Sequence, residues 1–140
     1  MPIPNKVLVQ QLSQQQDNKC VFCDCTMQYH NGEAHLHPRA MTKEHIVPKA
    51  HGGNNEESNL VASCCRCNSL RGTIHYDLFV LIVRKLHKDA NFQKYWHAKH
   101  PFIVKCLRIA VKLEVMHAYA YVCRHTAFTF LEKRKQFNPQ

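Results

Sequence analysis

The fold is decided by residues 60–73, which read LVASCCRCNSLRGT. The first four residues are apolar or small, as in a short buried strand, and a Cys-x-x-Cys pair, Cys64 and Cys67, follows at once. Asn68 and Ser69 are then expected to be N-caps of a helix that begins directly after the pair. The segment therefore predicts a strand, a metal-binding knuckle and a helix in immediate succession.

A second Cys-x-x-Cys pair, Cys20 and Cys23, lies about 40 residues upstream. A two-residue spacer lets each pair present both sulfurs to one tetrahedral ion, and two pairs fill all the positions of a structural zinc site. No secretory signal is recognisable, so we expect a cytoplasmic protein with reduced thiols. The pattern predicts Zn²⁺ on Cys20, Cys23, Cys64 and Cys67. The adjacent Cys25 and Cys65 could compete as ligands, and an iron–sulfur cluster is the minor alternative.

The insert between the two pairs predicts a second strand. Residues 41–47 are suited to a strand that ends at Pro48, and the turn-forming residues Gly52 and Gly53 follow. With the strand at residues 60–63, this segment predicts a hairpin with a long connecting loop.

The composition favours a polyanionic partner. The chain has 140 residues and a net charge of +9, which suits nucleic acid or an anionic membrane surface. The stretch from Phe102 to Cys123 is apolar overall but contains four charged residues, each costly near a bilayer centre, so we expect no membrane span.

Helices are expected on both sides of the cysteine region. Residues 6–16 predict a short amphipathic helix, and the region after residue 75 is helical in pattern, with an unbroken stretch over residues 102–137. Leu78, Leu81, Ile82 and Leu86 are predicted to share a buried face. We expect an N-terminal arm at 1–19, a core at 20–74 and a helical extension at 75–140.

The region between the pairs carries further short motifs. They are Glu44-His45-Ile46-Val47-Pro48, then Gly52-Gly53, then Asn59-Leu60-Val61, with Asn68 directly after Cys67. In this order and spacing, residues 20–73 resemble the HNH endonucleases. The resemblance implies an α+β fold: a ββα-metal core with a four-cysteine zinc site, here with a short N-terminal helix and a C-terminal helical extension.

The resemblance also implies a mechanism for hydrolysing DNA phosphodiester bonds. His45 would activate water, and Glu44 and Asn68 would bind a catalytic Mg²⁺ or Mn²⁺, for which carboxylate and amide oxygens are suitable ligands. Asn59 would orient the loop or the His45 backbone. Two positions depart from the commonest family pattern, because Glu44 replaces Asp and Asn68 replaces His.

Neighbouring side chains on a regular strand point to opposite faces, so Glu44 and His45 can act together only if the strand bulges or ends there. Basic residues that flank the site are expected to bind DNA phosphates without reading the sequence. These residues are Lys43, Lys49, Arg66 and Arg71.

Two other functions compete with the nuclease. One is a zinc-stabilised nucleic-acid-binding module with weak or no catalysis, and the other is an accessory subunit of a phage or defence complex. The helical extension could complete the core, reach along the duplex or form a homodimer.

Overall fold

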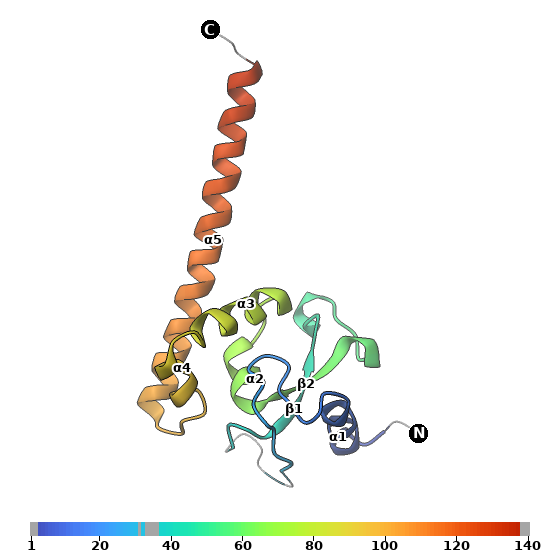
Figure 1. The fold of residues 1–140 in the computed structure, drawn as a ribbon. Helices are drawn as coiled ribbons and strands as arrows, with labels where there is room; N and C mark the ends of the chain where they lie inside the picture. Colours follow the sequence, from blue (N-terminus) through green and yellow to red (C-terminus); the bar gives the residue numbers. More distant parts are fainter. Residues whose placement is uncertain (1–2, 31, 33–36, 138–140) are drawn as a thin grey trace.

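The computed structural model describes residues 3–30, 32 and 37–137, with side chains through residue 126. Seven helices and strands follow one another in the described chain (Figure 1). They are α1 (Asn5–Gln15), β1 (Met41–His45), β2 (Leu60–Cys64), α2 (Cys65–Arg71), α3 (Tyr76–Leu86), α4 (Ala90–Tyr95) and α5 (Pro101–Phe137). Two short 3-10 turns, Lys49–His51 and Glu57–Asn59, lie in the loop between the strands.

The centre of the fold is a ββα unit. Strands β1 and β2 pair antiparallel in a regular register, from Met41 opposite Cys64 to His45 opposite Leu60. Helix α2 begins at the residue that follows β2, so the predicted succession of strand, knuckle and helix is confirmed. The expected α+β class with a ββα core is therefore the observed one.

The predicted start of α2 was wrong by several residues. The helix begins at Cys65, so Asn68 and Ser69 lie inside it and neither is its N-cap. The N-cap is Cys64, whose sulfur accepts a hydrogen bond from the backbone N–H of Cys67. A cysteine sulfur thus takes the place of the hydroxyl or carboxylate that usually caps a helix. The second Cys-x-x-Cys pair therefore lies at the start of α2.

The core lies between this unit and the helices on either side. Leu12 of α1 is buried against the sheet, and Phe22 of the first knuckle packs edge-on against Phe79 of α3, with ring centroids 4.9 Å apart. The buried face of α3 was only partly predicted, because Leu81 is 61% exposed and Phe79 takes its place in the core. This packing holds the two knuckles against the end of the sheet.

Helix α5 extends far beyond the rest of the molecule (Figure 1). Leu107 and Val111, near its beginning, are buried against the core, whereas Leu113, Met116 and Tyr119 are exposed. Across the described residues, we find no helix with the length and apolar character needed to cross a membrane. The structure gives no support to the expected homodimer, since it does not show what covers this exposed face.

Candidate metal centre and nuclease site

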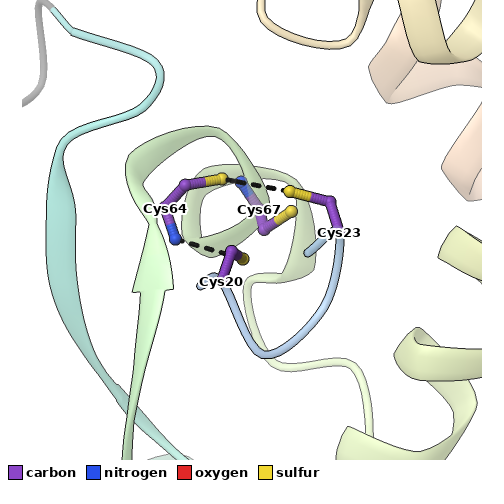
Figure 2. Close-up of side chains that lie close together, drawn as sticks. All are labelled: Cys20, Cys23, Cys64 and Cys67. Carbon is purple, nitrogen blue, oxygen red and sulfur yellow. Dashed lines mark hydrogen bonds between the residues drawn. The ribbon is translucent and has the colours of Figure 1, made fainter. Parts of the chain in front are cut away.

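Four cysteine sulfurs from distant parts of the chain meet at the end of β2. The side chains of Cys20, Cys23, Cys64 and Cys67 point toward one another, and their sulfur atoms all lie within 4.8 Å of one another (Figure 2). The Sγ atoms of Cys23 and Cys64 are 3.7 Å apart. Zn–S bonds of about 2.3 Å in a tetrahedron place neighbouring sulfurs roughly 3.8 Å apart, so the predicted ligands fit one zinc ion.

Backbone N–H groups support these sulfurs. The N–H of Cys64 donates to Sγ of Cys20 at 3.2 Å, and the N–H of Cys67 donates to Sγ of Cys64 at 3.4 Å. Hydrogen bonds from the surrounding thiols, first that of Cys20 and then that of Cys25, hold the pKa of Cys23 below its ordinary value. This favours the thiolate form of Cys23, the form that binds metal, whereas contacts with the neighbouring thiols raise the pKa of Cys64 and burial raises the pKa of Cys67.

Two further groups adjoin the cluster. Cys25, Cys23, Cys64 and His97 form a second set whose ligand atoms lie within 4.8 Å of one another. The Nε2 atom of His97 is 3.5 Å from Sγ of Cys64 and 3.7 Å from Sγ of Cys23. The His97-x-x-His100 spacing in the sequence is ligand-like, but two histidines on a helix surface are the commoner explanation of such a spacing. Only the tertiary structure brings His97 to the cysteines.

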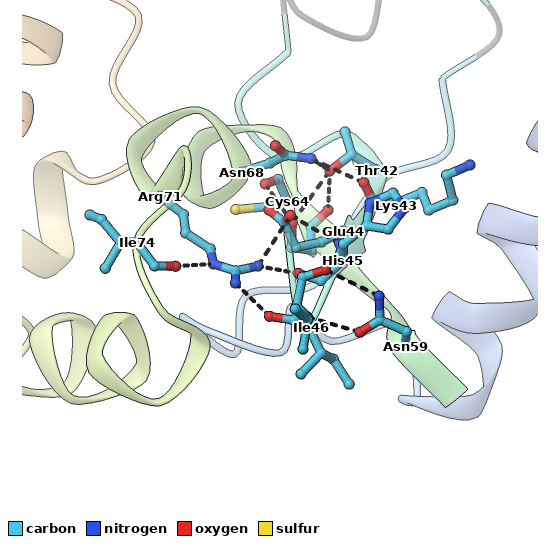
Figure 3. Close-up of polar contacts among 12 residues, drawn as sticks. Thr42, Lys43, Glu44, His45, Ile46, Asn59, Cys64, Asn68, Arg71 and Ile74 are labelled. Carbon is cyan, nitrogen blue, oxygen red and sulfur yellow. Dashed lines mark hydrogen bonds and ion pairs between the residues drawn. The ribbon is translucent and has the colours of Figure 1, made fainter. Parts of the chain in front are cut away.

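Glu44 faces helix α2 and is paired with Arg71. The Glu44 side chain is 10% exposed and its Oε1 lies 3.2 Å from Nη1 of Arg71, whose side chain is fully buried (Figure 3). The same Oε1 accepts a hydrogen bond from the His45 N–H at 3.0 Å. Burial raises the pKa of Glu44, while the nearby Arg71 and the His45 N–H oppose the rise.

The second oxygen of this carboxylate, Oε2, is buried and has no hydrogen-bond partner among the described residues. A buried carboxylate oxygen in this state needs a proton, a water or a cation to satisfy it. This orphaned atom fits the expected cation-binding role of Glu44, although its partner Arg71 already neutralises part of the charge.

Asn68 lies on the same interface as Glu44. Its side-chain N–H₂ donates to Oγ1 of Thr42 at 3.0 Å and to the carbonyl of Lys43 at 3.2 Å. Thr42 and Glu44 are two residues apart on β1 and so share one face, and Asn68 and Arg71 are three apart on one helix face. Glu44 and Asn68 thus both contribute to the interface between β1 and α2, Glu44 through Arg71 and Asn68 through Thr42 and Lys43.

His45 is the last residue of β1. The strand pairs regularly up to His45 and has no bulge. Of the two arrangements that would let Glu44 and His45 act together, a bulge or a strand end, the structure has the strand end. The Nε2 atom of His45 lies 2.9 Å from Oδ1 of Asn55, in the loop between the strands. Sequence reasoning missed Asn55. Its position after Gly52 and Gly53 gives no signal of a contact with His45.

Asn59 fixes the loop that follows His45. Its Oδ1 accepts from the Val47 N–H at 2.8 Å, and its Nδ2 donates to the carbonyls of Val47 and Asn54 at 3.1 and 2.9 Å. A Cβ atom on Gly53 would lie 1.8 Å from the Val47 carbonyl oxygen, so only glycine permits this close approach. These contacts agree with an orienting role for Asn59 rather than a chemical one.

Two of the four expected DNA-binding residues lie inside the protein. Arg66 is 8% exposed and donates to the carbonyls of Trp96 and Ala98 at 2.8 and 2.7 Å. Arg71 is 1% exposed, and beside its ion pair it donates to three backbone carbonyls (Figure 3). These guanidinium groups are used within the fold, and the assignment of Arg66 and Arg71 to DNA stays a prediction. Lys43 is half-buried and Lys49 is exposed.

Comparison with protein families agrees with this geometry. Residues 20–73 match the family described as HNH endonuclease. Neither the curated proteins nor the solved structures gave a match to the chain. The match covers both cysteine pairs, both strands and all of α2. Residues 20–73, somewhat under half of the chain, are therefore similar to the family described as HNH endonuclease.

Proposed function

We propose that this protein is a metal-dependent endonuclease that hydrolyses DNA phosphodiester bonds. The observation that supports the proposal is that Glu44 of β1 contacts Arg71 of α2 and Asn68 of α2 contacts β1, inside a segment that matches the HNH endonuclease family. His45 follows Glu44 directly at the end of the strand. A structural Zn²⁺ on the four cysteines holds the helix and the strands in this arrangement.

His45 is the proposed general base. The Asn55 side-chain oxygen can only accept a hydrogen bond, so the imidazole that it faces carries its proton on Nε2. That tautomer leaves Nδ1 unprotonated and able to take a proton from water. Asn55 is accordingly a positioning residue, which sets the tautomer and the direction of the ring.

Glu44 and Asn68 are the proposed ligands of a catalytic divalent cation. A hard ion such as Mg²⁺ or Mn²⁺ would be held by the free Oε2 of Glu44 and the side-chain oxygen of Asn68. When bound, such an ion supplies charge relief at the phosphate and stabilises the leaving 3′ oxygen. Arg71 meanwhile holds the other carboxylate oxygen and so orients Glu44.

His45→Ala is expected to abolish plasmid nicking while the fold and the zinc content stay unchanged. General base catalysis contributes roughly 10²- to 10⁴-fold, so cutting should fall by at least the lower figure. Wild type should cut with Mg²⁺ or Mn²⁺ and stop cutting with EDTA. His51→Ala is the matched control, because His51 is an exposed histidine in the same loop. Full cutting by a folded His45→Ala protein would exclude the base assignment.

A second candidate function is a zinc-stabilised DNA-binding module without catalysis. The observation in its favour is that Glu44 is buried and paired with Arg71, an arrangement that is stable without a catalytic ion. The nicking assay separates the two functions. Metal-independent DNA binding without any cutting by folded wild type would favour the module over the nuclease. Membership of a phage or defence complex stays a prediction.

Lys43 and Lys49 remain as proposed phosphate contacts. Replacing either residue with alanine should weaken binding to DNA of any sequence. Removing one phosphate-binding lysine should reduce the slope of log affinity against log salt by about 0.9. Titration of a labelled duplex over a range of salt concentrations measures this. Lys88→Ala, which changes an exposed lysine after α3, is the control. An unchanged slope in the double Lys43/Lys49 variant would remove these two lysines from the proposal.

A further inference from the structure

Residues 96–98 lie outside the HNH match, yet they adjoin the cysteine cluster. The indole Nε1 of Trp96 donates to Sγ of Cys67 at 3.3 Å, and Trp96 is 0% exposed. The imidazole Nε2 of His97 lies within 3.7 Å of the sulfurs of both Cys23 and Cys64. We propose that Trp96 and His97 donate hydrogen bonds to the zinc thiolates, so that metal binding fastens the helical extension to the HNH domain.

The charge of the site explains why such donors are needed. Four thiolates and one Zn²⁺ carry a net charge of −2 in a largely buried place, and an uncompensated buried charge is costly. Groups that donate to metal ligands also fix their orientation, and losing one typically weakens metal binding roughly 10- to 100-fold. Trp96 and His97 supply two such donors from a part of the chain that follows the second cysteine pair by about 30 residues.

The backbone of the same segment is held by the second knuckle. Arg66, between Cys65 and Cys67, donates to the carbonyls of Trp96 and Ala98. The ring of His87, which follows α3, packs edge-on against Trp96 with centroids 4.5 Å apart. The extension thus contacts the metal centre through both backbone and side chains, and a loss of metal would remove the acceptors on which Trp96 and His97 depend.

His97 could instead be a ligand, because it belongs to the second set with Cys23, Cys25 and Cys64. In that arrangement the ligands would include the more accessible Cys25, while Cys20 and Cys67, which are only 2% and 0% exposed and also face the cluster, would bind no metal. That arrangement would also leave the indole N–H of Trp96 donating to a neutral thiol. Both observations favour the four-cysteine set, with His97 as a donor to it.

The test measures zinc affinity in the full chain, by competition with a chromogenic chelator. Trp96→Phe keeps the ring but removes the N–H, and His97→Leu removes the imidazole. Each should weaken zinc binding roughly 10- to 100-fold. His97→Gln, which keeps a side-chain N–H donor, should restore most of the affinity. Tyr95→Phe and His100→Gln, which change exposed neighbours, should have no effect.

X-ray absorption of the zinc-loaded protein determines the ligand set. Four sulfur neighbours support the proposal, and three sulfurs with one nitrogen would overturn it. Hydrogen exchange of the zinc-loaded Trp96→Phe protein should become faster across residues 87–107, while the amides of β2 stay protected. Unchanged exchange there would overturn the coupling to the extension.

The inference rests on the zinc site proposed above and not on nuclease activity. Wild type that binds no zinc would defeat both the zinc proposal and this inference. Wild type that binds zinc, with unaltered affinity in both Trp96→Phe and His97→Leu, would defeat only this inference.

Discussion

Cys64→Ser is expected to empty the metal centre and to unfold the protein. The Cys64 sulfur is one of the four that meet within 4.8 Å, and it also caps helix α2. A hydroxyl binds Zn²⁺ far more weakly than a thiolate. Structural zinc contributes roughly 10 to 16 kcal/mol in small domains, as much as the whole free energy of unfolding of most domains. Zinc content and circular dichroism at 25 °C measure the two effects.

The neighbouring Cys65→Ser is the matched control for this experiment. Cys65 is half-buried and belongs to neither set of candidate ligands in the described chain. The Cys65→Ser substitution makes the same sulfur-to-oxygen change in the adjacent residue. The zinc content and the helix signal of this variant should therefore remain those of wild type. A well-folded, metal-free Cys64→Ser protein would contradict the idea that zinc holds the fold together.

Arg71→Met is expected to destabilise the protein by roughly 3 to 5 kcal/mol, the usual cost of removing one partner of a buried ion pair. The substitution would leave the buried Glu44 without its counter-charge. It would also remove the donors to the carbonyls of His45, Ile46 and Ile74. Urea unfolding followed by fluorescence of the single tryptophan, Trp96, measures the destabilisation.

Two further variants show whether the ion pair causes this destabilisation. Adding Glu44→Gln to Arg71→Met removes the unpaired charge and should recover part of the stability. Arg71→Lys should recover little, because lysine cannot make the several directed hydrogen bonds of the guanidinium group. Arg84→Met, on the exposed side of α3, is the control. If Arg71→Met were as stable as wild type, the buried pair would have no structural role.

This expectation differs from the role that the sequence suggested for Arg71. The sequence pattern predicted Arg71 in the first turns of a helix, where free backbone N–H groups attract phosphate, but Arg71 lies in the last turn of α2. Nothing local distinguishes a surface arginine from a buried one. Arg71 is held inside the protein by Glu44, which lies 27 positions earlier in the chain, and by three backbone carbonyls. Burial of this kind depends on contacts between distant segments, which no short pattern records.

The sequence by itself determined the ββα order and the four cysteines. Strand, knuckle and helix follow one another within residues 60–73, and the Cys-x-x-Cys spacing sets which sulfurs can face one ion, so both are local properties. It also predicted a strand over residues 41–47, although the observed strand β1 ends two residues earlier, at His45.

Only the tertiary structure decided which distant groups complete the site. Asn55 faces His45, Arg71 pairs with Glu44, and Trp96 and His97 reach the cysteines. Each of these contacts joins residues ten or more positions apart, across a loop or between packed elements. Their formation depends on the buried core that brings the segments together, and hydrophobic packing is non-directional, so the local sequence does not specify which polar side chains it will place side by side.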